Sequence, residues 1–303
     1  MILNLRFDGN AEPFVNYLKN FAEISASLLL EIDPTEKAFI AKSFTTDKAS
    51  VRYSSISFED CKAVVVSDEG AGKVEPGRIR VGILHYLPKF ISMLKMAAPK
   101  IDPKAEAKEG EVPGFNIKID YDYMMSKVGT KDLTATQIVV ESSDLKMNMN
   151  GFRTNEFRYL ADDKFNSIFK AEDPIHFDMS AAMISQIVKT SDIIKIDPNK
   201  DALDFYVDGK TVHVRSNLSG EKGSKSTAPS GFDQVIAELP EAPSYEISAN
   251  IFREKFVVMM NKCEDDYEVS MGLHRSVDGD KVDRILFKSK NSNTKIILSI
   301  INE

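Results

Sequence analysis

The sequence predicts an α+β fold of two similar domains, each with two helices packed on antiparallel sheets. Strand-like and short helical runs alternate, and the order strand, helix, strands occurs four times along the chain. The helices are too widely spaced for a solenoid repeat, so the four units group into two pairs. A chain of 303 residues, 43% of them hydrophobic, is long enough to bury a core in each domain.

Each predicted helix has one apolar side. In the first, Phe14, Leu18 and Phe21 fall at i, i+4 and i+7, which places them on one face. Pro88 suits the first turn of the second helix, and Ser180 suits the N-cap position of the third. The four predicted helices span residues 11–24, 87–98, 180–190 and 250–262.

The predicted strands alternate apolar and polar residues or end at turn residues. The segment 33–36, Asp-Pro-Thr-Glu, links two of them, and Asp208-Gly209 is a hairpin turn signal. The predicted strands span residues 3–8, 27–32, 37–44, 50–58, 78–84, 115–123, 133–141, 145–150, 174–178, 203–207, 210–216, 245–248, 267–273, 284–289 and 295–301.

These elements predict a first domain over residues 1–150, a connector over 151–173 and a second domain over 174–303. The connector mixes aromatic and charged residues with weak periodicity, which indicates a partly buried link with hydrophobic anchor points. Residues 102–114 are rich in Lys, Glu, Pro and Gly, which is typical of a solvated loop.

Composition limits the classes of function. The formal net charge is -7, whereas proteins that grip nucleic acid through phosphate contacts are usually basic. A protein that encircles DNA would tolerate this charge, because topology can replace tight contact. No apolar stretch approaches the length of a membrane helix, and the N-terminus is interpreted as a first strand rather than a signal peptide. Cys61 and Cys263 are interpreted as reduced thiols.

Signals of catalysis are weak. The four histidines are scattered without an i, i+4 partner, and no phosphate-binding loop has the required order. Asp120 and Asp122 fall on one face of a strand and would suit a cation in a metal-dependent nuclease. The alternative is an ordinary solvated strand face. We therefore predict no catalytic residue, no metal site and no cofactor, and keep the nuclease as an alternative.

The polar sides of the helices carry mainly basic or neutral residues, although the chain is acidic. Arg253 is expected there too, while Glu23 and Glu254 interrupt the basic character. A solvated surface without function is the alternative interpretation. The lysines expected to face a polyanion are Lys19, Lys89, Lys95, Lys189, Lys255 and Lys262.

Two stretches resemble a known family. Residues 18–30, LKNFAEISASLLL, are similar to the first helix and following strand of the DNA sliding clamps of tailed phages, which belong with the proliferating cell nuclear antigen family. Residues 183–209, followed by Lys210, resemble the opening of their second domain. The repeat order extends this resemblance over nearly the whole chain.

The resemblance implies a sliding clamp that encircles double-stranded DNA as a head-to-tail homotrimer and tethers the replicative DNA polymerase. It also implies an ATP-dependent clamp loader as a partner, no enzymatic activity, no membrane, and the cytoplasm of an infected bacterial host if a phage encodes the chain. A monomeric DNA-binding processivity factor of the same fold remains an alternative.

The resemblance also implies two protein-binding regions. Partner peptides of such clamps bind near the connector, where this chain offers aromatic and apolar anchors. Subunits pair through edge strands, for which residues 145–150 and 211–216 are the candidates. The connector residues are Phe157, Tyr159, Leu160, Phe165 and Phe169, and the interface residues are Leu145, Met147, Met149, Val212 and Val214.

Overall fold

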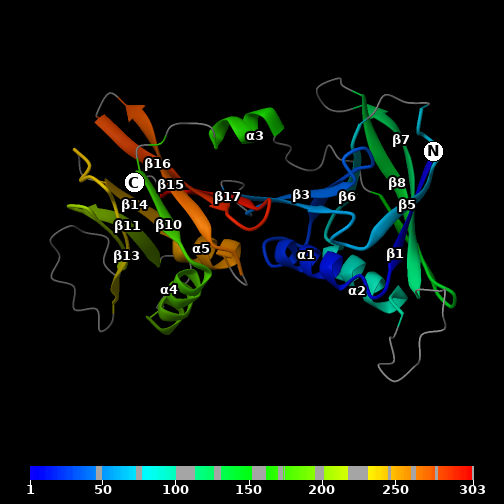
Figure 1. The fold of residues 1–303 in the computed structure, drawn as a ribbon, viewed down its shortest axis with the longest axis horizontal. Coiled ribbons are helices and arrows are strands. Elements are labelled where there is room, and N and C mark those ends of the chain that lie inside the picture. Colours follow the sequence, from blue (N-terminus) through cyan, green and yellow to red (C-terminus); the bar gives the residue numbers. More distant parts are fainter. Residues whose placement is uncertain are drawn as a thin grey trace. The chain divides into compact units, whose positions relative to one another are not determined.

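The computed structural model divides the chain into two compact units (Figure 1). Unit 1 comprises Met1–Ser43 and Tyr53–Arg158, and unit 2 comprises Phe44–Arg52 and Tyr159–Glu303. The residues that the structure describes are 1–45, 50–72, 77–99, 113–125, 131–151, 162–169, 173, 175–194, 201–217, 231–244, 247–260, 264–276 and 279–301.

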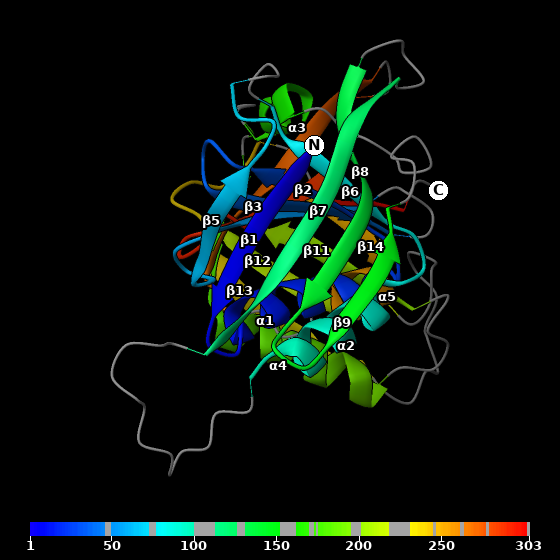
Figure 2. The same ribbon diagram turned by 90° about the vertical axis from the view of Figure 1, so that its right-hand side faces the viewer.

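Unit 1 consists of antiparallel strands with one parallel contact and two helices. One group of strands has the order β5-β1-β7-β8, with β9 also paired to β8 (Figure 2). Strand β8 also pairs in parallel with β6, which begins a second group of strands in the order β6-β2-β3-β4. The elements are β1 (Ile2–Asp8), α1 (Glu12–Ala22), β2 (Leu28–Asp33), β3 (Ala38–Phe44), β4 (Val51–Ser57), β5 (Ala63–Asp68), β6 (Ile79–Ile83), α2 (Leu87–Ala97), β7 (Gly114–Met125), β8 (Lys131–Glu141) and β9 (Lys146–Asn150).

The core of unit 1 follows from the predicted periodicities. Strand β1 alternates half-buried and buried residues, so that Leu3, Leu5 and Phe7 all point into the core. The stripe of α1, with Phe14 and Phe21, joins the same cluster. Helices α1 and α2 therefore pack together and present their remaining sides to solvent.

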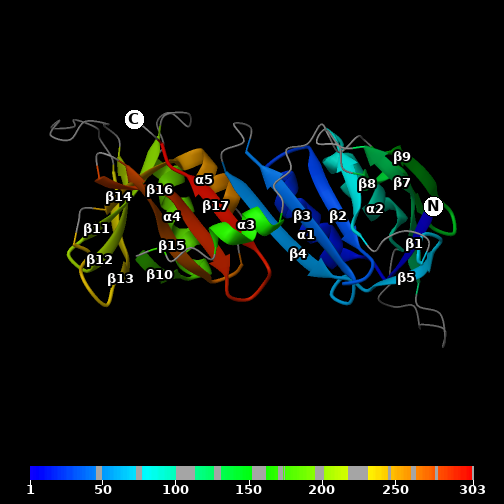
Figure 3. The ribbon, with the colours of Figure 1, turned by 90° about the horizontal axis from the view of Figure 1, so that it is seen from above.

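The described residues of unit 2 form two groups of antiparallel strands and three helices, which can be followed in Figure 3. The sheet orders are β10-β15-β16-β17 and β13-β12-β11-β14. Its elements are α3 (Asp162–Ile168), β10 (Ile175–Met179), α4 (Ala181–Ile194), β11 (Ala202–Asp208), β12 (Thr211–Asn217), β13 (Asp233–Glu238), β14 (Ile247–Phe252), α5 (Arg253–Met260), β15 (Tyr267–Ser276), β16 (Gly279–Ser289) and β17 (Lys295–Ser299).

The segment Phe44–Arg52, early in the chain, belongs to unit 2. A guanidinium nitrogen of Arg52 donates a hydrogen bond to the carbonyl oxygen of Met259 at 3.2 Å. The Ser50 hydroxyl oxygen accepts one from the Ser299 amide at 3.1 Å, which places the start of β4 beside β17. A division by sequence position alone would have put this segment in the first domain.

The repeat predicted from the sequence is confirmed. The first helix of each unit precedes three antiparallel strands, β2-β3-β4 in unit 1 and β11-β12-β13 in unit 2. The second helix precedes β7-β8-β9 in unit 1 and β15-β16-β17 in unit 2. Strands β5 and β13 and helix α3 were not predicted, and α5 begins at Arg253 because residues 250–252 end β14. None of the helices in the described ranges is long and apolar enough to span a membrane.

Candidate nucleic-acid interface and docking pocket

Five of the six predicted lysines lie on the helices, and Lys262 lies outside the described residues. Lys89 and Lys95 on α2 and Lys189 on α4 are exposed, while Lys19 on α1 and Lys255 on α5 are half-buried. The Lys19 ammonium donates a hydrogen bond to the side-chain oxygen of Asn16 at 2.8 Å. Each unit therefore presents cations on both of its main helices.

Arg253 is not part of this surface, so its predicted exposure is wrong. It is only 5% exposed. Its Nε donates to the carbonyl oxygen of Ser191 at 3.0 Å, and its guanidinium pairs with Asp192. A buried cation needs such partners, because losing its hydration is costly. Arg253 therefore joins the end of α4 to the start of α5.

The two units differ in the acids beside these cations. Helix α2 has no acidic residue in its first turn, whereas α5 has the exposed Glu254 there. No carboxylate of the described residues lies within ion-pair distance of Lys89, Lys95 or Lys189. Helix α2 therefore carries two exposed lysines and no acidic residue along its length.

Two of the five predicted connector anchors, Phe165 and Phe169, lie within the described residues. Phe157, Tyr159 and Leu160 lie outside the described residues. Phe165, on α3, is fully buried, and its ring lies 5.2 Å from that of Phe169. Phe165 therefore packs within unit 2 and offers no exposed anchor to a peptide, which corrects the prediction for this residue.

Unit 2 holds α3 through its last strand. The Lys295 ammonium donates a hydrogen bond to the Asn166 side chain at 2.8 Å and lies 5.5 Å from the centre of the Phe169 ring. The Lys295 side chain thus contacts both α3 and Phe169, the residue directly after it, and attaches this helix to β17.

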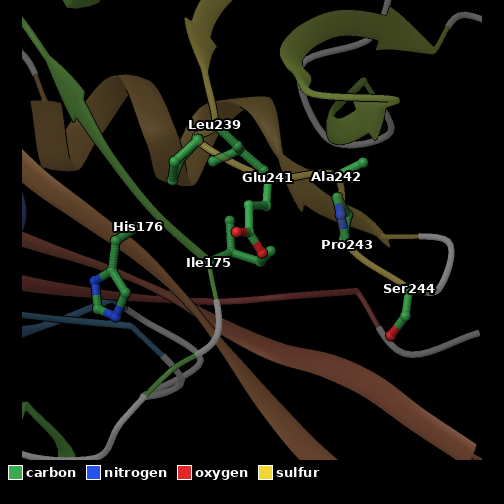
Figure 4. A pocket seen from close by; sticks show the side chains of 8 residues that line it. Ile175, His176, Leu239, Glu241, Ala242, Pro243 and Ser244 are labelled. Carbon is green, nitrogen blue, oxygen red and sulfur yellow. The ribbon is translucent and has the colours of Figure 1, made fainter.

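A pocket of about 460 Å³ lies near the start of β10, soon after the connector in the chain. Figure 4 shows Ile175, Leu239 and Glu241 around its middle, with His176 and Ser244 at opposite ends. Pro240, Ala242 and Pro243 complete its lining. The pocket thus combines an apolar floor with one exposed carboxylate.

The predicted edge strands are half right. Strand β9 pairs with β8 and has no second neighbour among the described strands. Its Met147 and Met149 are half-buried against the core of unit 1, as Leu145 before it is half-buried. Strand β12 is not an edge, because it lies between β11 and β13. Val212 and Val214 are fully buried there, so their assignment to a subunit interface is wrong.

Beside β12, the edge of that sheet is formed by β13. This strand pairs with β12 alone, and its Val235 is 56% exposed. Strand β13 was not predicted from the sequence, and without it β12 had no neighbour on that side. The alternation of Val235 with the buried Ile236 was the available signal.

The alternative metal site gains no support. Asp122 accepts a hydrogen bond from the backbone amide of Tyr123, and Asp120 lies on the same strand. In the described ranges, no three His, Cys, Asp or Glu side chains are grouped so that they could hold a metal ion. Asp120 and Asp122 are therefore not part of such a group.

Solved structures with the same arrangement are sliding clamps. The structure of A. fulgidus PCNA in complex with the C-terminal region of FEN-1 matches this chain over 99% of both chains, with 12% sequence identity and a TM-score of 0.57. The protein has the sliding-clamp fold. The PCNA2–PCNA3 complex of Sulfolobus tokodaii matches with 11% identity and a TM-score of 0.54 over 100% of both chains.

A bacterial β clamp is also similar. The H. pylori β clamp in complex with 5-chloroisatin is 12% identical, with a TM-score of 0.60 over 99% of this chain and 66% of that chain. This chain thus spans about two thirds of that clamp. No family model matches the sequence, and no curated protein matches it. The sliding-clamp fold is therefore evident in the structure while its sequence has diverged far from these neighbours.

Proposed function

We propose that this protein is a sliding clamp, a non-enzymatic ring that encircles duplex DNA and tethers a DNA polymerase. The observation that carries the proposal is the doubled unit of the sliding-clamp fold with lysines on all four main helices. A net charge of -7 suits such a ring, because encirclement keeps the protein on DNA without strong attraction over its whole surface. The tailed-phage affiliation and the cytoplasm of an infected host stay predictions.

The internal repeat supports a head-to-tail ring. Within unit 2, β17 lies beside the start of β4. In the repeated order, β9 of unit 1 occupies the place of β17, and β13 of unit 2 occupies the place of β4. Both β9 and β13 are edge strands, so we propose that β9 of one copy pairs with β13 of the next. Such a contact closes a ring only if the rotation fits, and three copies would give six units.

Edge-strand variants test this contact. Proline removes a ladder hydrogen bond, so Val235→Pro in β13 and Asn148→Pro in β9 should each give folded monomers. Val66→Pro is the matched control, because it changes an exposed residue of another edge strand, β5, and should leave the oligomer intact. The measurements are light scattering after size exclusion and far-ultraviolet circular dichroism. Intact oligomers from both test variants would place the interface elsewhere.

The pocket beside β10 is the proposed site for partner peptides. The FEN-1 and DNA ligase segments in the A. fulgidus and H. pylori structures are precedents for short peptides on this fold. Here the apolar lining would take an apolar anchor, and Glu241 would favour a basic residue beside it. We propose that the polymerase and an ATP-dependent loader both use this pocket.

A charge reversal tests the pocket. Glu241→Lys should weaken the binding of a polymerase-derived peptide several-fold, because the substitution puts a cation where we expect the peptide's own basic residue. Glu264→Lys, an equally exposed change in unit 2, is the control and should have no effect. Fluorescence polarisation measures both. Equal affinities for the two variants would exclude this pocket.

A topological experiment tests the function itself. The native protein should have about three times the mass of the 33.9 kDa chain. Loaded onto circular DNA, it should remain bound in high salt and leave when the circle is cut, because a ring slides off an end. A monomeric processivity factor would dissociate in high salt from both forms. That outcome, or loss of bound protein that does not depend on cutting, would overturn the proposal.

A further inference from the structure

An aromatic residue directly precedes the second helix of each unit, and a lysine follows it three positions later. Tyr86 is the N-cap residue of α2, and the Lys89 ammonium lies 4.7 Å from the centre of its ring. Phe252 directly precedes α5, and the Lys255 ammonium lies 5.0 Å from its ring centre. Both distances are typical of a cation held on an aromatic face.

The two pairs occupy equivalent places in the repeat. Helix α2 connects β6 to β7, and α5 connects β14 to β15. The residues between aromatic and lysine differ, Leu-Pro in one unit and Arg-Glu in the other. The aromatic residue and the lysine are thus shared while their surroundings are not. On the first helix of unit 1 the lysine is held differently, since Lys19 bonds to an asparagine.

An aromatic ring orients a lysine without cancelling its charge. A carboxylate partner would compete with any phosphate for the ammonium, whereas the ring is neutral. A lysine side chain also loses up to about 2 kcal/mol of rotamer entropy when it is fixed by a ligand. A ring that already restricts the side chain removes part of that loss. A lysine held in this way should therefore bind an anion more tightly than a lysine without a ring.

We propose that Tyr86 and Phe252 are positioning residues, which hold the proposed DNA-contacting lysines Lys89 and Lys255 ready for a phosphate. The ligand class is the phosphodiester backbone of duplex DNA, contacted without regard to base sequence. This inference rests on the proposed clamp function and identifies the lysines that contribute most to DNA binding.

The two pairs should not contribute equally. Tyr86 is 39% exposed, and the first turn of α2 has no acidic residue. Phe252 is half-buried, and Glu254 stands next to Lys255. An adjacent carboxylate repels phosphate and lowers the local potential. The Tyr86–Lys89 pair should therefore contribute more to DNA binding than its counterpart in unit 2.

The experiment is a double-mutant cycle on the intact protein with a short fluorescent duplex, titrated at several salt concentrations. Tyr86→Leu should weaken binding by about two- to fivefold and leave the salt dependence unchanged, because no charge is lost. Lys89→Gln should weaken binding and reduce the salt dependence. In the Lys89→Gln background, Tyr86→Leu should have no further effect. Tyr86→Phe, which keeps the ring, should behave as wild type.

Lys95→Gln is the matched control for the cycle, since Lys95 lies on the same helix. Combined with Tyr86→Leu, it should give purely additive losses. The inference would be overturned if the losses of affinity from Tyr86→Leu and Lys89→Gln were also additive, or if Tyr86→Leu bound DNA as wild type does. The circular-DNA experiment could still support a clamp in either case. Wild-type protein that binds no duplex would overturn the inference, and protein that leaves circular DNA regardless of cutting would overturn the clamp. Native mass and circular dichroism show whether each variant keeps its fold.

Discussion

Unit 1 and unit 2 share an order of elements but fill their cores differently. In unit 1 the ring of Phe39 lies 4.4 Å from Phe14, 4.7 Å from Phe58 and 6.0 Å from Phe7. In unit 2 the ring of Phe205 lies 5.8 Å from that of Phe256, its nearest aromatic ring among the described residues. The same strand and helix order thus tolerates a dense aromatic cluster or a looser one. The positions of apolar residues, rather than their identities, maintain the repeat.

The units also differ in how they bury charge. In unit 1, Glu31 is 2% exposed and pairs with Lys42, Arg78 and Arg80 at 3.7, 3.3 and 3.3 Å. In unit 2, Asp204 is 1% exposed but pairs with Arg215, whose side chain is 42% exposed. Removing the carboxylate therefore affects a buried ammonium, that of Lys42, in unit 1 and a partly hydrated guanidinium, that of Arg215, in unit 2.

The largest expected difference between the units concerns their aromatic cores. Phe39→Ala should destabilise unit 1 by about 3–5 kcal/mol, because a fully buried ring leaves a cavity among other rings. Phe205→Ala should destabilise unit 2 by an amount at the lower end of that range. Urea unfolding, monitored by the hydrogen exchange of backbone amides in each unit, measures both effects. Equal losses would show that the aromatic cluster adds nothing beyond buried volume.

The second prediction concerns the buried carboxylates. Glu31→Gln should cost about 3 kcal/mol, since it leaves Lys42 and its neighbours without their shared anion. Asp204→Asn should cost about 1 kcal/mol, because the exposed side of Arg215 can be hydrated. Thermal unfolding of the matched variants compares the two. A larger loss for Asp204→Asn would reverse the proposed difference in burial.

Much of the fold could be predicted because it depends on local periodicity. The stripe of Phe14, Leu18 and Phe21 indicated α1, and Asp208-Gly209 indicated the β11–β12 hairpin. Strand β5 was missed because Val64 and Val66 break the alternation with exposed apolar side chains. Strand β13 was missed because Val235 and Ile236 are its only β-branched residues and because it follows a Ser/Gly/Lys segment.

The candidate site was harder to predict because its residues depend on distant partners. The exposure of Lys89 and Lys95 follows from the apolar side of a single helix. The burial of Arg253 depends on Asp192 and Ser191, which lie on another helix. The pocket near β10 combines Ile175 with the segment after β13. No local pattern reveals such pairings.

The third prediction concerns a feature that the two units share. The Tyr206 hydroxyl donates to Asp233 in unit 2, and the Tyr121 hydroxyl donates to Asp68 in unit 1, both at 2.5 Å. Burial, followed by the hydrogen bond to Asp233, raises the pKa of Tyr206 from 10.0 to about 12. Burial and Asp68 likewise raise the pKa of Tyr121.

The contribution of the Tyr206 hydroxyl to the free energy of unfolding should be fully present below pH 10, where the phenol is protonated in both the folded and the unfolded chain. It should be lost as the pH rises toward about 12, because the unfolded chain ionises first. Tyr206→Phe should remove this alkaline loss from unit 2 and leave that of unit 1. Phenolate absorbance and urea unfolding between these pH values measure it. The same alkaline loss in the variant would assign it to other groups.

The smallest expected effects come from the matched hairpin turns. Unit 1 joins β2 to β3 through Lys37, at φ 50°, and unit 2 joins β11 to β12 through Gly209, at φ 59°. A residue with a side chain is destabilised by roughly 1–2 kcal/mol in this left-handed region. Glycine removes this strain, but its greater conformational entropy in the unfolded chain offsets about 0.4–1 kcal/mol of the gain. Lys37→Gly should therefore stabilise unit 1 by about 0.5 kcal/mol.

Gly209→Ala should destabilise unit 2 by a similar amount, because a Cβ there meets no atom within 4 Å and only backbone strain is added. Lys37 keeps its main-chain role in the glycine variant, since its carbonyl oxygen still accepts from the Phe58 amide. Unfolding midpoints of the two variants should move in opposite directions, and the double variant should be near wild type if the units unfold together. Shifts of the same sign would show that the side chain of Lys37, rather than its backbone angle, decides the stability of that turn.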